Sequence, residues 1–401
     1  MYGISGRAAR TVVALLCAGA VAGCTSDASG EDRTAAASGP APTGPPVRIV
    51  SVQDALTAEQ YEAGIDAAVA AVNREGGIAG RPLHIEHCSN EDNADVAAAC
   101  ARSAANDKSV VAVVGSANNF GSATAPVYEQ AGLVSLQHPY TQADYTSPSM
   151  YNISGGAMVT AYAGAALMTE RLEAEKTALA YLDVPAGRAM GPQLRGFYGP
   201  RDLTAPAGVA VSKSAADLSP QVAKVLDGDP DAVQLALTTD LASRFIQSVR
   251  QQGSQVPIVV PSMVYSAETV REQLGDATDE LYFAGELCHG APGYDKFTAD
   301  VEADKGEYST DSALTGWTAV QVFAQIAGKL DRIERGSFTA AIKKTSAIDG
   351  LGVIPDLDFT KSSSALDGQY PRLFNTSGCA FEYTDGGIEQ YGDPLDDLFR
   401  P

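Results

Sequence analysis

Residues 110–134, VVAVVGSANNFGSATAPVYEQAGLV, decide the fold. The apolar, β-branched run 110–114 predicts a parallel strand that is buried on both faces and ends at Gly115. Residues 116–121 predict a polar loop, and residues 122–131 predict a short helix opened by a hydroxyl cap. This order directs free backbone N–H groups and the positive end of the helix dipole toward a ligand above the sheet edge.

The composition indicates a globular protein with two cores. The chain has 401 residues, and a single core stops growing near about 250 to 300 residues. Hydrophobic residues make up 45% and charged residues 19%, a typical globular balance. The formal net charge of -21 argues against nucleic acid and anionic membrane surfaces as partners. We therefore interpret the negative charge as a means of solubility.

The N-terminus indicates export. Arg7 and Arg10 precede the apolar run 11–22, so residues 1–23 are expected to be a signal peptide. The sequence VAGC, residues 21–24, resembles the lipobox of bacterial lipoproteins, in which the cysteine, here Cys24, is lipidated. Residues 24–46 are small, polar and proline-rich, which predicts a flexible tether. We expect the protein to be lipid-anchored to the outer face of the cytoplasmic membrane.

Strand and helix patterns alternate from residue 47 onward. Strands are expected at 47–52, 82–88, 110–114, 133–137, 177–182, 232–237, 257–260 and 281–284. Helices are expected at 57–73, from Asn93, and at 122–131, 159–173, 239–252, 267–274 and 312–330. Alternation of this kind predicts an α/β fold of two doubly wound parallel-sheet lobes.

Residues 64–80, GIDAAVAAVNREGGIAG, followed by Arg81, Pro82 and Leu83, resemble the signature of the type I periplasmic binding proteins. The resemblance is strongest to the leucine/isoleucine/valine-binding branch. It implies an extracytoplasmic receptor of an ABC importer that closes two lobes around a small polar ligand, acts as a monomer and docks on a membrane permease. It also implies three crossings between the lobes. Lobe one would then hold residues 47–154 and 291–353, and lobe two residues 155–290 and 354–401.

Four cysteines remain after the signal peptide and the lipidated position: Cys88, Cys100, Cys288 and Cys379. An even count in an exported protein favours disulfides, and four cysteines allow three pairings. We favour Cys88 with Cys100, because a strand end and the next helix approach each other in a βαβ unit. The layout that the resemblance implies brings Cys288 and Cys379 together in lobe two.

Ligands of doubly wound sheets bind beyond the carboxyl ends of the strands, so the residues that follow the strands are the candidates. In lobe one these are Ser116, Asn118, Asn119, Gln137, His138, Tyr140 and Thr141. The resemblance implies that such segments hold a ligand carboxylate, although Asn118 and Ser116 could simply cap a helix. The resemblance also places Trp317, the only tryptophan, in the cleft, whereas large aromatics more often lie in a core.

Lobe two departs from the leucine/isoleucine/valine-binding pattern. Asp183 and the residues after it include no aromatic side chain, Thr238 stands where a tyrosine is common, and Ser262 replaces the acid that often meets an amino-acid ammonium. Asp183, Asp240 or Glu286 could take over that role, and each could equally be a solvated loop carboxylate. The ligand is therefore expected to be an amino acid or a similar small polar molecule, with an amide or urea as the alternative.

No metal site or cofactor is expected. His84 and Cys88 would point to one side of a strand and His87 to the other, so they cannot converge on one ion. His138 and His289 could meet near the cleft, but they would need added carboxylates. The sequence contains no G-x-S-x-G, G-x-x-x-x-G-K-[ST], G-x-G-x-x-G or H-E-x-x-H motif, which argues against an enzyme. Two alternatives stay open: a ligand sensor that feeds a membrane signalling partner, and an exported hydrolase or metal-dependent enzyme.

Overall fold

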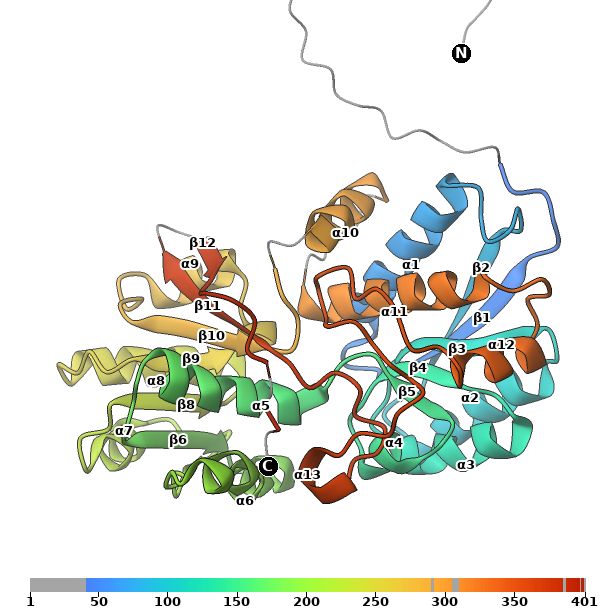
Figure 1. Ribbon diagram of the computed structural model, residues 1–401. Coiled ribbons are helices and arrows are strands. Elements are labelled where there is room, and N and C mark those ends of the chain that lie inside the picture. Colours follow the sequence, from blue (N-terminus) through green and yellow to red (C-terminus); the bar gives the residue numbers. More distant parts are fainter. Residues whose placement is uncertain (1–40, 290–291, 305–309, 385–386, 397, 400–401) are drawn as a thin grey trace, which may run out of the picture. The chain divides into compact units, whose positions relative to one another are not determined.

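The structure, a computed structural model, describes residues 41–401 except 290–291, 305–309, 385–386, 397 and 400–401 (Figure 1). The expected signal peptide, Cys24 and the tether up to residue 40 lie outside the described residues. The end of that expected tether is bound to the folded body: the N–H groups of Thr43 and Gly44 donate to the carbonyl of Gly80, at 3.1 and 3.2 Å. Within the described part of the chain, no helix is both long and apolar enough to cross a membrane.

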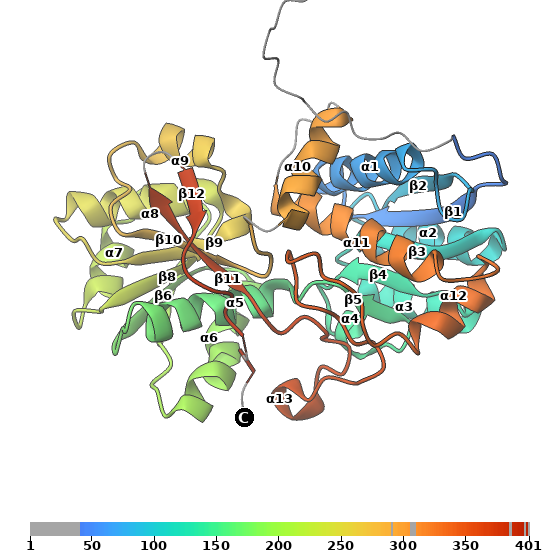
Figure 2. The same cartoon turned by 45° about the horizontal axis from the view of Figure 1, so that its top comes forward.

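The first sheet has five parallel strands in the order β2-β1-β3-β4-β5. Its strands are β1 (Val47–Gln53), β2 (Leu83–Ser89), β3 (Val110–Ala117), β4 (Ser135–His138) and β5 (Met150–Asn152). Helices α1 (Ala58–Arg74), α10 (Pro292–Ala303) and α11 (Asp311–Ala327) and helices α2 (Ala94–Asn106), α3 (Gly121–Ala131), α4 (Gln142–Thr146) and α12 (Arg335–Ile342) surround it. Figures 1 and 2 show α1 and α11 over one face of the sheet and α2 and α3 over the other.

Strand β3 differs from its prediction at both features that follow the apolar run. Gly115 does not end the strand: with φ +75° it forms an irregularity in the pairing with β4, and β3 continues to Ala117. Helix α3 has Phe120 as its N-cap and no side-chain cap, so the expected hydroxyl cap is wrong. The side chain of Asn118 takes that role in part, because its Oδ1 accepts from the N–H of Phe120 at 3.2 Å.

Helices α1 and α11 pack so closely that only glycine fits at their contact. A Cβ on Gly316 would lie 2.5 Å from the carbonyl oxygen of Tyr61, and a Cβ on Gly64 would overlap the backbone of Ala313. Such contacts are far inside van der Waals distance, so both positions need a residue without a side chain. The close approach fixes Tyr61, in the first turn of α1, beside the first turns of α11.

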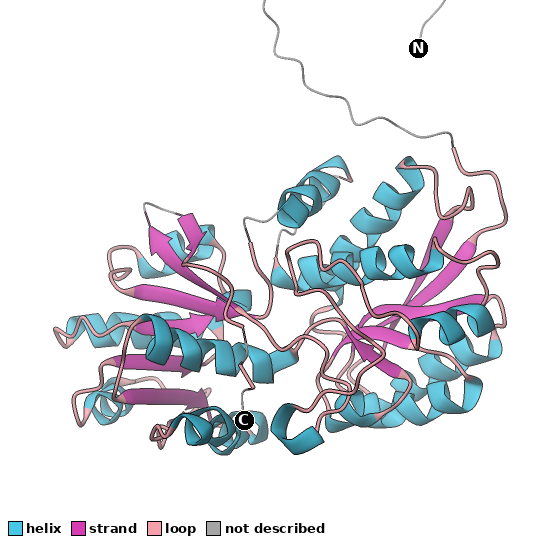
Figure 3. Ribbon diagram, in the orientation of Figure 1, coloured by secondary structure: helices cyan, strands magenta, loops and turns pink. Residues whose placement is uncertain are grey.

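The second sheet has seven strands in the order β12-β11-β10-β9-β8-β6-β7 (Figure 3). Its strands are β6 (Thr177–Leu182), β7 (Val209–Val211), β8 (Ala232–Ala236), β9 (Ile258–Pro261), β10 (Leu281–Gly285), β11 (Cys379–Thr384) and β12 (Gly387–Gln390). Strands β6 to β10 run parallel, while β11 is antiparallel to both β10 and β12. An antiparallel edge on a parallel sheet is common, and periodicity did not predict it here.

The helices around the second sheet include one that changes type along its length. Helix α5 (Gly156–Ala166) continues as the π-helix η1 (Leu167–Arg171), where the sequence predicts one helix over 159–173. The others are α6 (Pro185–Tyr198), η2 (Gly199–Arg201), α7 (Ser219–Leu226), α8 (Thr239–Gln251), η3 (Ser262–Val264), α9 (Ala267–Leu274) and α13 (Ala365–Gly368). Two sheets, each with helices between successive parallel strands, confirm the expected fold class. We call the elements around the first sheet lobe one and those around the second lobe two.

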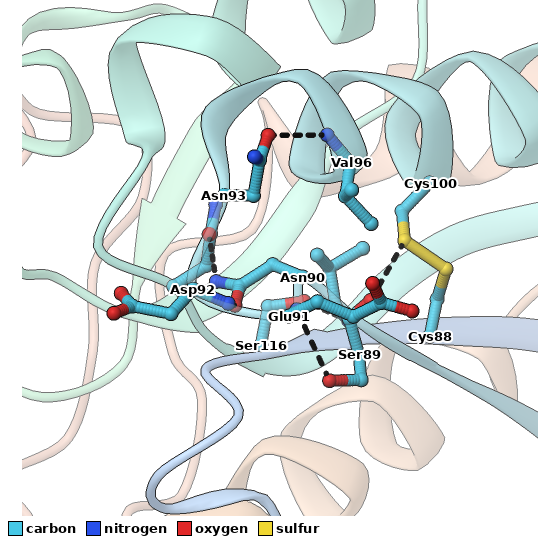
Figure 4. The surroundings of a disulfide bond; sticks show 11 residues. Cys88, Ser89, Asn90, Glu91, Asp92, Asn93, Val96, Cys100 and Ser116 are labelled. Atoms are coloured by element: carbon cyan, nitrogen blue, oxygen red, sulfur yellow. Dashed lines mark hydrogen bonds between the residues drawn. A yellow bond between two sulfur atoms is a disulfide. The ribbon is translucent and has the colours of Figure 1, made fainter.

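Two disulfides join the pairs of cysteines that the sequence favours. Cys88, in β2, is bonded to Cys100 in α2, with 5.9 Å between their Cα atoms (Figure 4). The side chain of Asn93 caps the start of α2 by accepting from the N–H groups of Asp95 and Val96. Cys288 is bonded to Cys379, the residue that pairs with Gly285 across β10 and β11. The second disulfide therefore fastens the segment that leaves β10 to its own sheet.

Candidate ligand site

A small polar cavity lies where the strands of both sheets end, and its free volume is about 10 Å³, room for about one water-sized group. His138 is the last residue of β4, Ser262 follows β9, and Glu286 follows β10. The first turns of three helices complete the lining with Tyr61, Thr160, Asp311, Ser312 and Thr315, and Met263 adds the remaining side chain. Strand ends and helix N-termini are the places where doubly wound sheets bind ligands.

Glu286 lines this cavity and contacts residues of both lobes. Its carboxylate lies 3.2 Å from Nδ1 of His138 and accepts from the N–H of Gly156, the first residue of α5. Gly156 has φ +71°, a conformation that favours glycine, and that turn points its N–H at the carboxylate. A carboxylate at a helix N-terminus is further stabilised by the helix dipole. Glu286 is buried, with 8% of its surface exposed.

Asp311, the first residue of α11, is the second acid of the cavity. It accepts from Ser262 Oγ at 2.6 Å and from His289 Nε2 at 2.7 Å. Burial alone would raise the pKa of Asp311, but the neighbouring His289 and the hydrogen bonds from His289 and Ser262 outweigh it and hold the pKa below its usual value. Asp311 is therefore ionised at neutral pH.

Tyr61 lines this cavity, and Tyr140 lines a neighbouring groove. Their hydroxyls lie 3.3 Å apart, and the ring of Tyr140 meets the ring of His138 edge-on at 4.7 Å between centroids. Burial, more than any other cause, raises the pKa of both tyrosines above the ordinary value. Both hydroxyls are consequently neutral throughout the physiological range and can donate or accept a hydrogen bond.

The neighbouring groove is larger, with about 590 Å³ of free volume, and it opens to solvent. It is lined by residues 139–142 and Tyr145 of lobe one and by the start of α5, the ends of β6 and β8 and the start of α6 from lobe two. Its largest apolar side chains are those of Met158, Leu182, Met190 and Leu237. None of the described residues that line it is charged.

Five of the candidates from the sequence line one of these two spaces. His138 and Ser262 line the cavity, and Tyr140, Thr141 and Thr238 line the groove. Thr141 also opens helix α4 by a reciprocal cap with Asp144. These five residues come from both lobes, as the candidates at the strand ends were expected to do.

Four candidates of lobe one instead bind other parts of lobe one. Ser116 Oγ accepts from the N–H of Val52 at 2.8 Å, and Gln137 donates to Asp144 at 2.9 Å. Asn118 accepts from Asn90 and from the backbone after β3, and Asn119 donates to Asp54. None of the four is among the residues that line the cavity or the groove.

The remaining three candidates also lie away from both spaces. The side chain of Asp183 is 38% exposed and paired with Arg188, whose hydrogen bond lowers the pKa of that carboxyl. The side chain of Asp240 is 81% exposed. Trp317 is fully buried in the core of lobe one, and its Nε1 donates to Asp300 at 3.0 Å. Trp317 is therefore a core residue and does not line the cavity or the groove.

The histidines do not converge on a common centre. His138 is paired with Glu286, His289 with Asp311, and His87 with Asp66 at 2.9 Å. Among the residues that the structure describes, no three His, Cys, Asp or Glu side chains are grouped so that they could hold a metal ion.

Sequence reasoning named Glu286 as one possible acid but missed six other cavity residues: Tyr61, Thr160, Met263, Asp311, Ser312 and Thr315. All of them except Met263 lie near the starts of helices α1, α5 and α11, and a search limited to the residues after strands passes over them. The sequence held one signal for Asp311: it follows the hydroxyl of Thr310 at the start of a strong helix pattern. Such a helix start faces the same edge of the sheet as the strand ends.

Two doubly wound lobes that share a polar cavity at their strand ends define a ligand-binding protein of the two-lobe class. A family model described as periplasmic binding protein matches residues 51–370. The chain belongs to this family, which confirms the resemblance seen in the sequence. A search of curated proteins found no match.

Solved structures of the same fold align with this chain over nearly their whole length. LivK, a leucine binding protein from Thermotoga maritima, is 16% identical over 88% of this chain and 99% of its own, with a TM-score of 0.67. The substrate binding protein LivJ from Streptococcus pneumoniae, solved with isoleucine, is 16% identical over 86% and 99%, with a TM-score of 0.66. A fatty acid ABC transporter substrate-binding protein from Thermomonospora curvata is 16% identical over 90% and 95%, with a TM-score of 0.69.

Proposed function

We propose that the protein is the extracytoplasmic substrate-binding component of an ABC importer and that it binds a small solute carrying a polar group between its two lobes. The observation that carries the proposal is the cavity itself, to which strand ends and helix starts of both lobes contribute side chains. Membership of the periplasmic binding protein family supports a binding role over a catalytic one. The similar structures are those of substrate-binding proteins of ABC transporters, which favours the importer.

Ligand binding would act through closure of the lobes. We propose that lobe one comprises residues 47–154 and 291–353 and lobe two residues 155–290 and 354–401, so that the chain crosses three times. Glu286 and Gly156 would then stand at two of the crossings, and their hydrogen bond would link them. A ligand can shift the balance between open and closed forms only through contacts that it makes in the closed form.

We further propose that residues 1–23 direct export and that Cys24 carries a lipid. A metabolic label such as a radioactive palmitate should enter the wild-type protein in a bacterial host. The Cys24→Ala variant should not take up the label, and labelling of that variant would contradict the anchor.

The receptor role can be tested by a thermal-shift screen of the purified protein against amino acids, amines, amides, ureas and fatty acids. A ligand at 100 times its Kd should stabilise the fold by about 2.7 kcal/mol. A compound that shifts the melting transition should also be taken up by the host cell, and deletion of the gene for this protein should abolish that uptake. Binding without any loss of uptake on gene deletion would favour the sensor alternative, and the absence of binding across the panel would contradict a receptor.

A further inference from the structure

The cavity holds two carboxylates and no opposing Lys or Arg. Glu286 and Asp311 both line it, and none of the other described residues in its lining is a lysine or an arginine. Each acid has one imidazole partner and one neutral donor: His138 and the N–H of Gly156 for Glu286, His289 and the hydroxyl of Ser262 for Asp311. A carboxylate accepts about four hydrogen bonds, so both acids keep room for a further donor.

The cavity therefore favours a cationic group. Removing two carboxylates from water is unfavourable unless positive charge or hydrogen-bond donors compensate them. An ammonium offers three donors and a full positive charge, which match the acceptors of the acids that line the cavity. A ligand carboxylate in the same space would instead face two like charges.

Three side chains that would hold a ligand carboxylate elsewhere in lobe one are bound within that lobe. Ser116 and Asn118 accept hydrogen bonds from the N–H of Val52 and from Asn90, and Gln137 donates to Asp144. These side chains lie at the carboxyl ends of β3 and β4, where the family resemblance implied the carboxylate of an amino acid. In the structure they belong to the hydrogen-bond network of lobe one and line neither the cavity nor the groove.

The groove beside the cavity suits an apolar body. The thioethers of Met158 and Met190 and the side chains of Leu182 and Leu237 line it, and no charged side chain is among the described residues around it. Tyr140 lines the groove and touches Tyr61 of the cavity through its hydroxyl, so the two spaces meet at this tyrosine pair. Methionines adapt to apolar groups of varied shape.

We propose that the ligand is an organic amine without a carboxylate, whose ammonium binds Glu286 and Asp311 and whose aliphatic or aromatic body lies in the groove. This inference rests on the proposed receptor function and narrows it to one chemical class. It separates the protein from a receptor for zwitterionic amino acids.

The test compares compounds that share one carbon skeleton. Isothermal titration of the purified full chain with leucine, 3-methylbutylamine and 4-methylpentanoate separates zwitterion, cation and anion. Phenylalanine, 2-phenylethylamine and 3-phenylpropanoate repeat the comparison with an aromatic body. We expect each amine to bind at least about tenfold more tightly than its amino acid, because the amino acid also carries a carboxylate, which would be repelled by Glu286 and Asp311. No binding of the two acids is expected.

Variants place the ammonium in the cavity. Glu286→Gln and Asp311→Asn keep the size of each side chain and remove its charge, and each should weaken amine binding at least about tenfold. Asp240→Asn, which removes an exposed charge of the same lobe as Glu286, should leave the affinity unchanged. Circular dichroism melting of each variant without ligand checks that the fold is intact, and a titration of intact Glu286→Gln with unchanged affinity would overturn the proposal.

Failure of the ligand class differs from failure of the receptor function. If leucine or phenylalanine binds more tightly than its amine, the amine proposal is overturned and the receptor stands. The same holds if the six compounds fail while the wider thermal-shift panel finds a ligand that is not an amine. If the wider panel finds none, both proposals fail.

Discussion

Removal of the disulfide between Cys288 and Cys379 should lower the free energy of unfolding more than removal of the disulfide between Cys88 and Cys100. The two bonds close loops of 91 and 12 residues. The chain-entropy relation for a cross-linked unfolded state gives about 4.6 kcal/mol for the longer loop and about 2.8 kcal/mol for the shorter one. The expected difference is therefore about 1.8 kcal/mol in favour of the longer loop.

The comparison uses two double variants, each with both cysteines of one pair replaced by alanine. Urea unfolding is followed by far-ultraviolet circular dichroism and by the fluorescence of Trp317, which is the only tryptophan and lies in the core of lobe one. Coincident transitions by both probes would justify a two-state treatment. Equal losses of stability, or a greater loss from the 12-residue loop, would refute the loop-length reasoning.

Three further changes test the packing and the charges. Gly316→Ala should destabilise the protein by about 1 to 3 kcal/mol, because its Cβ would press on the carbonyl of Tyr61. The control Gly336→Ala, with open space around it, should be neutral or stabilising by up to about 1 kcal/mol. The urea midpoints of the two variants and the wild type measure both effects, and equal midpoints for the two variants would contradict the packing argument. Arg335→Lys should cost at least about 2 kcal/mol in chemical unfolding, since the guanidinium donates to four backbone carbonyls at the end of α2 and start of β3, and no loss would contradict that role. The depressed pKa of Asp311 means that its contribution to stability is present above its unfolded value near 3.8 and is lost as the pH falls through the folded pKa. In the Asp311→Asn variant, the free energy of unfolding should therefore fall less steeply as the pH is lowered below about 4. An unchanged fall would refute the contribution of the Asp311 carboxylate to stability.

The fold was predictable because its signals are local. The continuous apolar run of β3 and the alternating strand and helix patterns each specify an element without reference to distant residues. The antiparallel strand β11 was missed because its pairing with β10 joins segments about a hundred residues apart. Strand β12 joins the sheet only through β11 and was missed with it. Periodicity holds no information on such partners.

The candidate site was less predictable because its side chains compete for several roles. Ser116 and Gln137 have the right chemistry and the right place at strand ends, yet backbone and side-chain partners inside lobe one bind them. Asp311 and Tyr61 come from helix starts that meet only because Gly64 and Gly316 allow α1 and α11 to approach closely. That contact depends on tertiary packing, which a single sequence does not encode in its local pattern.

The central claim is that the cavity with Glu286 and Asp311 binds the head of the ligand. Its most direct measurement is the titration of 2-phenylethylamine into the wild-type protein and into Glu286→Gln, with Asp240→Asn as the control. The account predicts a loss of affinity of at least about tenfold for Glu286→Gln and none for Asp240→Asn. Equal affinities of all three proteins for the amine would contradict it.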